Sequence, residues 1–173
     1  MSDTPRLQGL QEFYVRLVAL WRSFCERHTE LFSVTCDEYS LLLTSEVDAL
    51  ESLLAKKDEL IFAIGDLDQK RRGVIAEINL MNSSLGTTNI KNVSDLIQIM
   101  KEYEENSGEN YLSKYNSLLI DIIEKIQNQN KKNQIFLNRS IISLREVREG
   151  ILGRKSYSTY NSQGQSNLVT LRG

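Results

Sequence analysis

The chain has 173 residues, of which 40% are hydrophobic and 25% charged, a composition typical of a folded domain with its own core. Its 21 basic and 23 acidic residues give a net charge of −2, so no electrostatic argument favours nucleic acid or an anionic membrane as partner. Pro5 is the one proline in the sequence. Because proline breaks helix interiors, its scarcity favours long helices.

Two cysteines, Cys25 and Cys36, are too few for the disulfide framework of a small secreted domain. We expect both to be reduced thiols. Residues 1–8 lack the apolar core of a signal peptide, and no stretch approaches the roughly 20 apolar residues that cross a bilayer. These features together predict a cytoplasmic protein without membrane insertion.

A first helix is predicted over residues 7–32, where apolar side chains recur at alternating steps of three and four. This stripe consists of Leu7, Leu10, Tyr14, Leu17, Trp21, Phe24, His28 and Leu31. The β-branched pair Val34 and Thr35 indicates a break, and Asp37 is the expected N-cap of the next helix.

A second helix is predicted over residues 37–83. Leu53, Leu60, Leu67, Val74 and Met81 repeat every seven residues along it. A strict seven-residue repeat indicates a left-handed supercoiled contact with another helix. Turn-forming residues follow from Ser83 to Asn92, and a short helix is predicted over residues 94–104.

The last predicted helix covers residues 109–154. Its apolar stripe runs from Leu112 to Ile151 and is interrupted by Asn130 and Asn133. The second and last helices match in length and are expected to form an antiparallel hairpin, with the first helix packed against one end. The fold class is therefore all-α: an elongated helical hairpin or coiled-coil bundle in a domain of residues 1–154. The repeats fit a monomer or a homodimer equally.

Residues 155–173 are mostly Ser, Thr, Asn, Gln and Gly and contain no acidic residue. Such a segment buries too little apolar surface to order itself. We therefore expect a flexible C-terminal tail that is disordered or that orders on a partner.

No catalytic residue, metal or cofactor is predicted. The single histidine, His28, has no evident base–nucleophile partner. Cys25, His28 and Cys36 could together form a three-ligand zinc site, but a packed histidine is the favoured interpretation. The paired acids Glu104 and Glu105 are interpreted as helix-surface charges.

The interruption at Asn130 and Asn133 has two interpretations. Buried asparagines can fix the register of paired helices at a cost in stability. Alternatively, the polar residues mark a partly open groove where a partner binds. The residues alone do not separate these alternatives.

Three features in order suggest a family. A leucine-rich helix carries the segment Asp68 to Arg72, a later helix carries Asn130-x-x-Asn133, and a polar tail carries Tyr160-x-x-x-Gly164. Over residues 35–165, this order resembles the FlgN-type flagellar export chaperones. The insert from Ser83 to Gly108 is longer than the family pattern, and the first helix is unusually rich in aromatic residues.

The resemblance implies a cytoplasmic chaperone that binds hook-associated proteins of the hook–filament junction, prevents their premature assembly and delivers them to the export apparatus. The cargo is expected to bind as a helix in an apolar groove. The implied cargo surface consists of Asn130, Asn133, Leu137, Ile141, Leu144, Val147, Ile151 and Leu152. Tyr160 and Gly164 are implied to dock on the cytoplasmic part of the export gate. A structural coiled-coil adaptor without an export role is the alternative, since it would share the same heptads.

Overall fold

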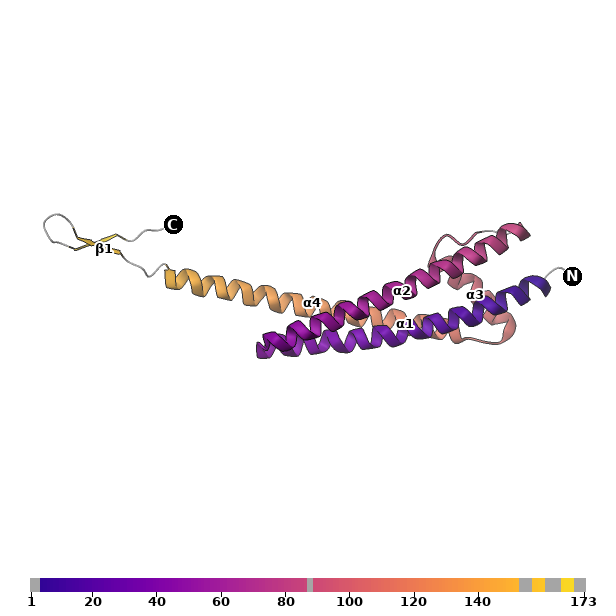
Figure 1. Cartoon of the computed structure of the whole chain (residues 1–173), viewed down its shortest axis with the longest axis horizontal. Helices are drawn as coiled ribbons and strands as arrows, with labels where there is room; N and C mark the ends of the chain where they lie inside the picture. Colours follow the sequence, from indigo (N-terminus) through magenta and orange to yellow (C-terminus); the bar gives the residue numbers. More distant parts are fainter. Residues whose placement is uncertain (1–3, 87–88, 153–156, 161–165, 170–173) are drawn as a thin grey trace. The chain divides into compact units, whose positions relative to one another are not determined.

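The computed structural model describes residues 4–86, 89–152, 157–160 and 166–169. Four helices follow in order (Figure 1): α1 (Thr4–Thr44), α2 (Val47–Leu85), α3 (Val93–Ser107) and α4 (Tyr111–Leu152). Two short strands follow, β1 (Tyr157–Tyr160) and β2 (Ser166–Val169). The predicted all-α fold class is confirmed. The chain divides into two compact units, Met1–Lys131 and Lys132–Gly173, and α4 continues from the first into the second.

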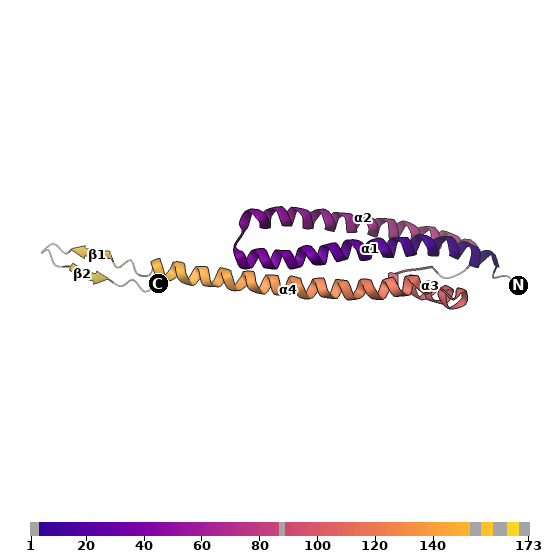
Figure 2. The same cartoon turned by 90° about the horizontal axis from the view of Figure 1, so that it is seen from below.

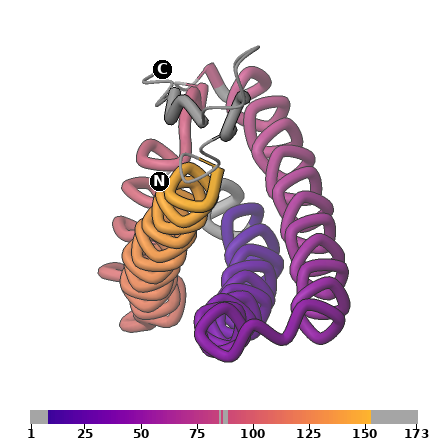
Figure 3. The backbone as a smooth tube through the Cα atoms, turned by 90° about the vertical axis from the view of Figure 1, so that its left-hand side faces the viewer, coloured from indigo at the N-terminus to yellow at the C-terminus, as the bar shows by residue number. Residues whose placement is uncertain are grey.

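In the first unit, α1 and α2 form an antiparallel hairpin (Figures 2 and 3). The turn between them contains Ser45, whose φ of 57° lies in the left-handed region that few residues other than glycine adopt. In the seven-residue repeat of α2, Leu60 and Val74 are buried and the other three members are half-buried. The predicted helix–helix contact is therefore confirmed, and α1 is the helix that α2 contacts along its length.

The predicted break after residue 32 is wrong, because α1 continues to Thr44 and Asp37 lies inside the helix. Val34 and Thr35 are buried, and the Thr35 hydroxyl donates a hydrogen bond to the Leu31 carbonyl at 2.7 Å. The helix-propensity cost of a β-branched residue is only about 0.5 kcal/mol. Burial of these side chains outweighs that cost. The second helix consequently begins at Val47 instead of residue 37.

The boundaries of α3 and the start of α4 lie within a few residues of the prediction. Asn92 and Asp95 form a capping box, in which each side chain accepts a hydrogen bond from the other residue's backbone N–H. Gly108, with φ of 76°, ends α3 in the left-handed conformation common at helix C-termini. The connection before α3 is held by Asn79, whose amide group makes two hydrogen bonds to the backbone of Ile90.

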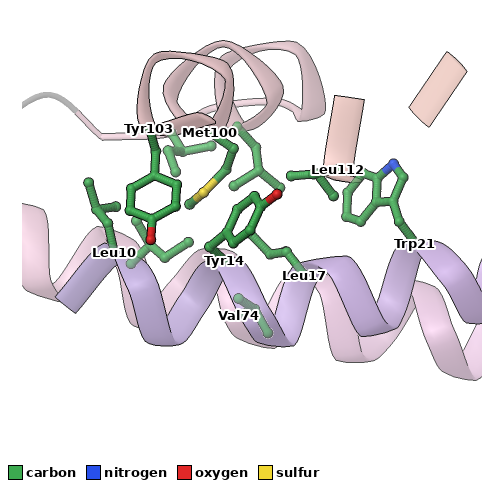
Figure 4. Packing of buried hydrophobic residues seen from close by; sticks show 11 residues of the cluster. Leu10, Tyr14, Leu17, Trp21, Val74, Met100, Tyr103 and Leu112 are labelled. Atoms are coloured by element: carbon green, nitrogen blue, oxygen red, sulfur yellow. The ribbon is translucent and has the colours of Figure 1, made fainter. Parts of the chain in front are cut away.

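Two apolar clusters form the core of the first unit. The larger joins all four helices around Tyr14, Trp21 and Met100 (Figure 4). Its buried members are Leu10, Tyr14, Leu17, Trp21, Val74, Ile78, Ile90, Leu96, Met100, Tyr103 and Leu112. The second cluster consists of Cys25, Leu31, Val34, Leu60, Ile122 and Ile126. The expected pairing is thus corrected: α1 and α2 form the full-length hairpin, and the first half of α4 completes the core as a further helix.

The second unit contains the rest of α4 and the paired strands. β1 and β2 are antiparallel, in a register that places Tyr157 opposite Val169 and Tyr160 opposite Ser166. The sequence predicted no strand here, because the segment is poor in apolar residues. Ordering of the whole tail on a partner stays a prediction.

Candidate binding surface

The start of α4 is held by a buried carboxylate from α3. Glu104 is 3% exposed, and its Oε1 accepts hydrogen bonds from the Tyr14 hydroxyl at 2.8 Å and from the Leu112 N–H at 2.7 Å. The backbone N–H of Ser113 also donates to Oε1, and the Ser113 hydroxyl donates to Oε2 of the same carboxylate. The first N–H groups of a helix have no partner within the helix, and the positive end of the helix dipole favours an anion. Glu104 therefore caps α4 and links it to α1.

These contacts change the proton affinity of both groups. Burial alone raises the pKa of Glu104, but the hydrogen bonds from Ser113, Tyr14 and Leu112 outweigh burial and hold this pKa below its ordinary value. Burial, together with the hydrogen bond to the Glu104 carboxylate, raises the pKa of Tyr14. The pair is thus a neutral phenol donating to an ionised carboxylate at neutral pH.

The interpretation of Glu104 as a surface charge is wrong. A signal was present in the sequence: Glu104 lies four residues after Met100 and eight after Leu96, on the apolar face of α3. A charged residue on such a face needs a partner when it is buried.

Two further contacts hold the first half of α4 against α1. The Trp21 indole N–H donates to the side-chain oxygen of Asn116 at 3.0 Å, and the Cys25 thiol donates to the Tyr115 carbonyl at 3.3 Å. Burial raises the pKa of the Cys25 thiol, which keeps it protonated. These polar contacts lie next to the apolar clusters and fix the rotation of α4 about its axis.

A third junction lies farther along the unit. The Lys57 ammonium of α2 is 2.5 Å from a carboxylate oxygen of Glu38 in α1 and 3.1 Å from the side-chain oxygen of Asn130 in α4. Both charged side chains are largely shielded from solvent. One cation therefore ties three helices at the same level, an arrangement that suits the register interpretation of Asn130.

The structure places the two predicted asparagines differently. Asn130 is exposed yet uses its oxygen on Lys57, which supports the register interpretation at this position. Asn133 is 2% exposed. A role of either residue in cargo binding stays a prediction.

The six predicted apolar anchors are all exposed. Every residue from Ile141 to Leu152 is exposed, and neither buried apolar cluster among the described residues extends beyond Ile126. Leu137 is 39% exposed, Leu144 70% and Ile151 64%. The remaining anchors are also exposed large apolar residues: Ile141, Val147 and Leu152.

These anchors share one side of an unbroken helix. Leu137, Ile141, Leu144 and Ile151 follow one another at steps of four, three and seven, which keeps them on one face. Counting back in the same steps reaches Ile126 and Ile122, which are buried. We call the exposed set Leu137, Ile141, Leu144, Val147, Ile151 and Leu152 the apolar face of α4. An exposed apolar strip of this kind is typical of interaction sites, and cargo binding to it stays a prediction.

The proposed gate-docking residues lie in the tail. Tyr160 is the last residue of β1, where the structure describes the backbone alone, and Gly164 lies outside the described residues. Within the described strands, Tyr160 lies opposite Ser166, which is not a predicted site residue.

Two of the three residues considered for zinc, His28 and Cys25, are engaged in helix contacts. His28 Nδ1 is 2.7 Å from the Phe24 carbonyl, and the Cys25 thiol bonds to Tyr115 as described above. Across residues 4–86, 89–152 and the two strands, no three His, Cys, Asp or Glu residues cluster in a way that could hold a metal ion. Nor does any described helix combine the length and apolar composition needed to cross a membrane.

Comparison with known proteins gives one family. A family model described as FlgN protein matches residues 16–167, which covers all of α2, α3 and α4 and most of α1. No curated protein and no solved structure matches the chain.

Proposed function

The chain belongs to the FlgN family of flagellar export chaperones, and we propose that its particular task is to bind hook-associated proteins and deliver them to the export apparatus. The general role of a flagellar export chaperone follows from membership of this family. The choice of cargo, the prevention of premature assembly and a cytoplasmic place of action belong to the proposal. The proposed role is one of binding, without a catalytic step.

The observation that carries the proposal is the apolar face of α4. The same stripe that is buried at Ile122 and Ile126 is exposed at Leu144 and Ile151. Apolar anchors at this helical spacing suit an amphipathic partner helix, which would remove them from water. A hook-associated protein whose terminal segment is not yet assembled would offer such a helix.

Substitution of the apolar face tests the proposal directly. Leu144→Asp combined with Val147→Asp should abolish binding of a purified hook-associated protein in calorimetry, because charged side chains would replace two anchors. Helicity and the Trp21 fluorescence of the first unit should not change. The matched control is Ile142→Asp, which alters another exposed apolar residue, on the opposite side of the helix. Equal cargo affinity for all three proteins would refute the proposed surface.

The tail has a separate role in the proposal. Tyr160 is proposed to dock on the cytoplasmic part of the export gate, with Gly164 in the same segment. Tyr160→Ala should weaken recovery of the purified gate protein in a pull-down while leaving cargo affinity unchanged. Equal recovery of gate protein would eliminate this role without affecting the cargo surface.

A further inference from the structure

The charges of the chain are strongly divided between its two units. Residues 1–131 contain 14 basic and 21 acidic residues, a net charge of −7. Residues 132–173 contain 7 basic and 2 acidic residues, a net charge of +5. The small net charge of the whole chain conceals this division, and such asymmetry indicates the charge of a partner.

The basic residues of the two units also differ in their contacts. Among the described residues, every ion pair is formed by side chains of α1 and α2. Arg145 and Arg148 in the second half of α4 are exposed, and neither forms an ion pair with another described residue. Both guanidinium groups are therefore available to carboxylates from outside the chain.

The position of these arginines on the helix is the decisive point. Arg148 is four residues after Leu144 and three before Ile151, so it interrupts the apolar face itself. Arg145 is four residues after Ile141 and borders the same face. A partner that covers the apolar anchors would therefore also cover both arginines.

The acidic residues of this segment lie on the other side. Glu146 is four residues after Ile142, and Glu149 is seven after it, so both acids share the reverse side of the helix with Ile142. Residues 141–152 have no net charge. Arg148 lies within the apolar face, and Arg145 lies between that face and Glu149, which follows it by four residues.

We infer that the apolar face of α4 selects an amphipathic helix that carries carboxylates beside its apolar anchors. This inference rests on the proposed function and names the chemistry of the cargo segment. Arginine presents a planar fork of donors that matches a carboxylate, and contact with apolar anchors excludes the water that would weaken the pairing. The apolar anchors then provide most of the affinity, and the arginines discriminate against helices with other flanking charges.

An anionic membrane suits this surface less well than an acidic helix. Membrane-bound amphipathic helices use an excess of positive charge on their polar side. Here residues 141–152 are neutral overall, and the polar reverse side of the helix carries two acids together with Arg139. A partner that binds one face of this helix therefore meets different charges from a partner that binds the reverse side.

The test uses two synthetic helical peptides of equal length with the same leucine anchors. One has glutamate beside the anchors, and the other has lysine. The wild-type chain should bind the glutamate peptide at least about tenfold more tightly in low salt, and this ratio should fall as salt screens the charges. Arg145→Glu with Arg148→Glu should invert the preference. The matched control is Arg139→Glu, which reverses an arginine on the side of Ile142 and should leave the preference intact.

Other outcomes would overturn the inference. Equal binding of the two peptides would show that the arginines do not discriminate between acidic and basic partners. Arginine-dependent binding to anionic vesicles without peptide discrimination would make a membrane the partner. Arginine-dependent dimerisation in sedimentation would make the acidic first unit of a second copy the partner. If a hook-associated protein still requires Leu144 and Val147 in any of these cases, the proposed function stands and the charge inference alone falls.

Discussion

The two halves of α4 carry the same apolar periodicity in different surroundings. In the first half, Leu112, Ile122 and Ile126 are buried against other helices. In the second half, Ile141, Leu144 and Ile151 continue the stripe and are exposed. Periodicity thus identifies the side of a helix that favours apolar contact, whereas the source of that contact depends on the rest of the chain.

Polar residues follow the same division. The first half of α4 is tied down by Glu104, Trp21 and Lys57, each of which reaches it from another helix. The arginines of the second half have no ion pair among the described residues. One half therefore contributes to the stability of the first unit, and the other is proposed to serve recognition. Paired substitutions can test each difference.

The largest expected difference in the free energy of unfolding comes from truncating one leucine in each half of α4. Leu112→Ala removes a side chain that is 1% exposed and should lower the free energy of unfolding by about 2–5 kcal/mol. Leu144→Ala removes one that is 70% exposed and should change it by no more than about 0.5 kcal/mol. Urea unfolding followed by Trp21 fluorescence measures both. Similar losses would show that the second half of α4 also contributes to a stable core.

The next contrast concerns the cap of α4. Glu104→Gln should lower the free energy of unfolding by about 1–3 kcal/mol, because it weakens the charged hydrogen bonds to Tyr14, Leu112 and Ser113. Glu149→Gln alters an exposed acid in the second half and is the matched control.

The same cap predicts a dependence on pH. The folded state holds the pKa of Glu104 below its ordinary value of 4.5, so the unfolded chain binds the proton more readily. The stabilisation from Glu104 is therefore complete well above pH 4.5 and is lost as the pH falls through the lower pKa of the folded state. Glu104→Gln should lack this part of the acid dependence in unfolding curves, and an unchanged dependence would argue against the cap.

The sequence predicted the helices well wherever the spacing of apolar residues determines the structure. The stripe of α1 from Leu10 to Leu31, the heptads of α2 and the limits of α3 follow from spacing and turn residues. The continuation of α1 through Val34 and Thr35 could not be predicted, because a local propensity of a few tenths of a kcal/mol was outweighed by burial that depends on distant residues. The prediction that α2 pairs with α4 was wrong because matched length does not specify which helices pack together.

The candidate site was predictable in part. The spacing of Leu137, Ile141, Leu144 and Ile151 was visible in the sequence, but spacing alone does not show whether such residues are buried or exposed. Lys57, which bonds to Asn130, and Tyr14, one of the partners of Glu104, lie 73 and 90 residues away in sequence and could not be read from a local pattern.

The smallest contrast separates the two interpretations of Asn130. Alanine is the better helix former by about half a kcal/mol, so Asn138→Ala, at an exposed position in the second half, should be slightly stabilising. Asn130→Ala gains the same propensity but loses the hydrogen bond to Lys57, and should be about 1 kcal/mol less stable than that control. Its affinity for a hook-associated protein should match the wild type if Asn130 sets helix register. A fall in affinity with no difference in stability would instead place Asn130 in the cargo groove and extend the recognition surface into the first half of α4.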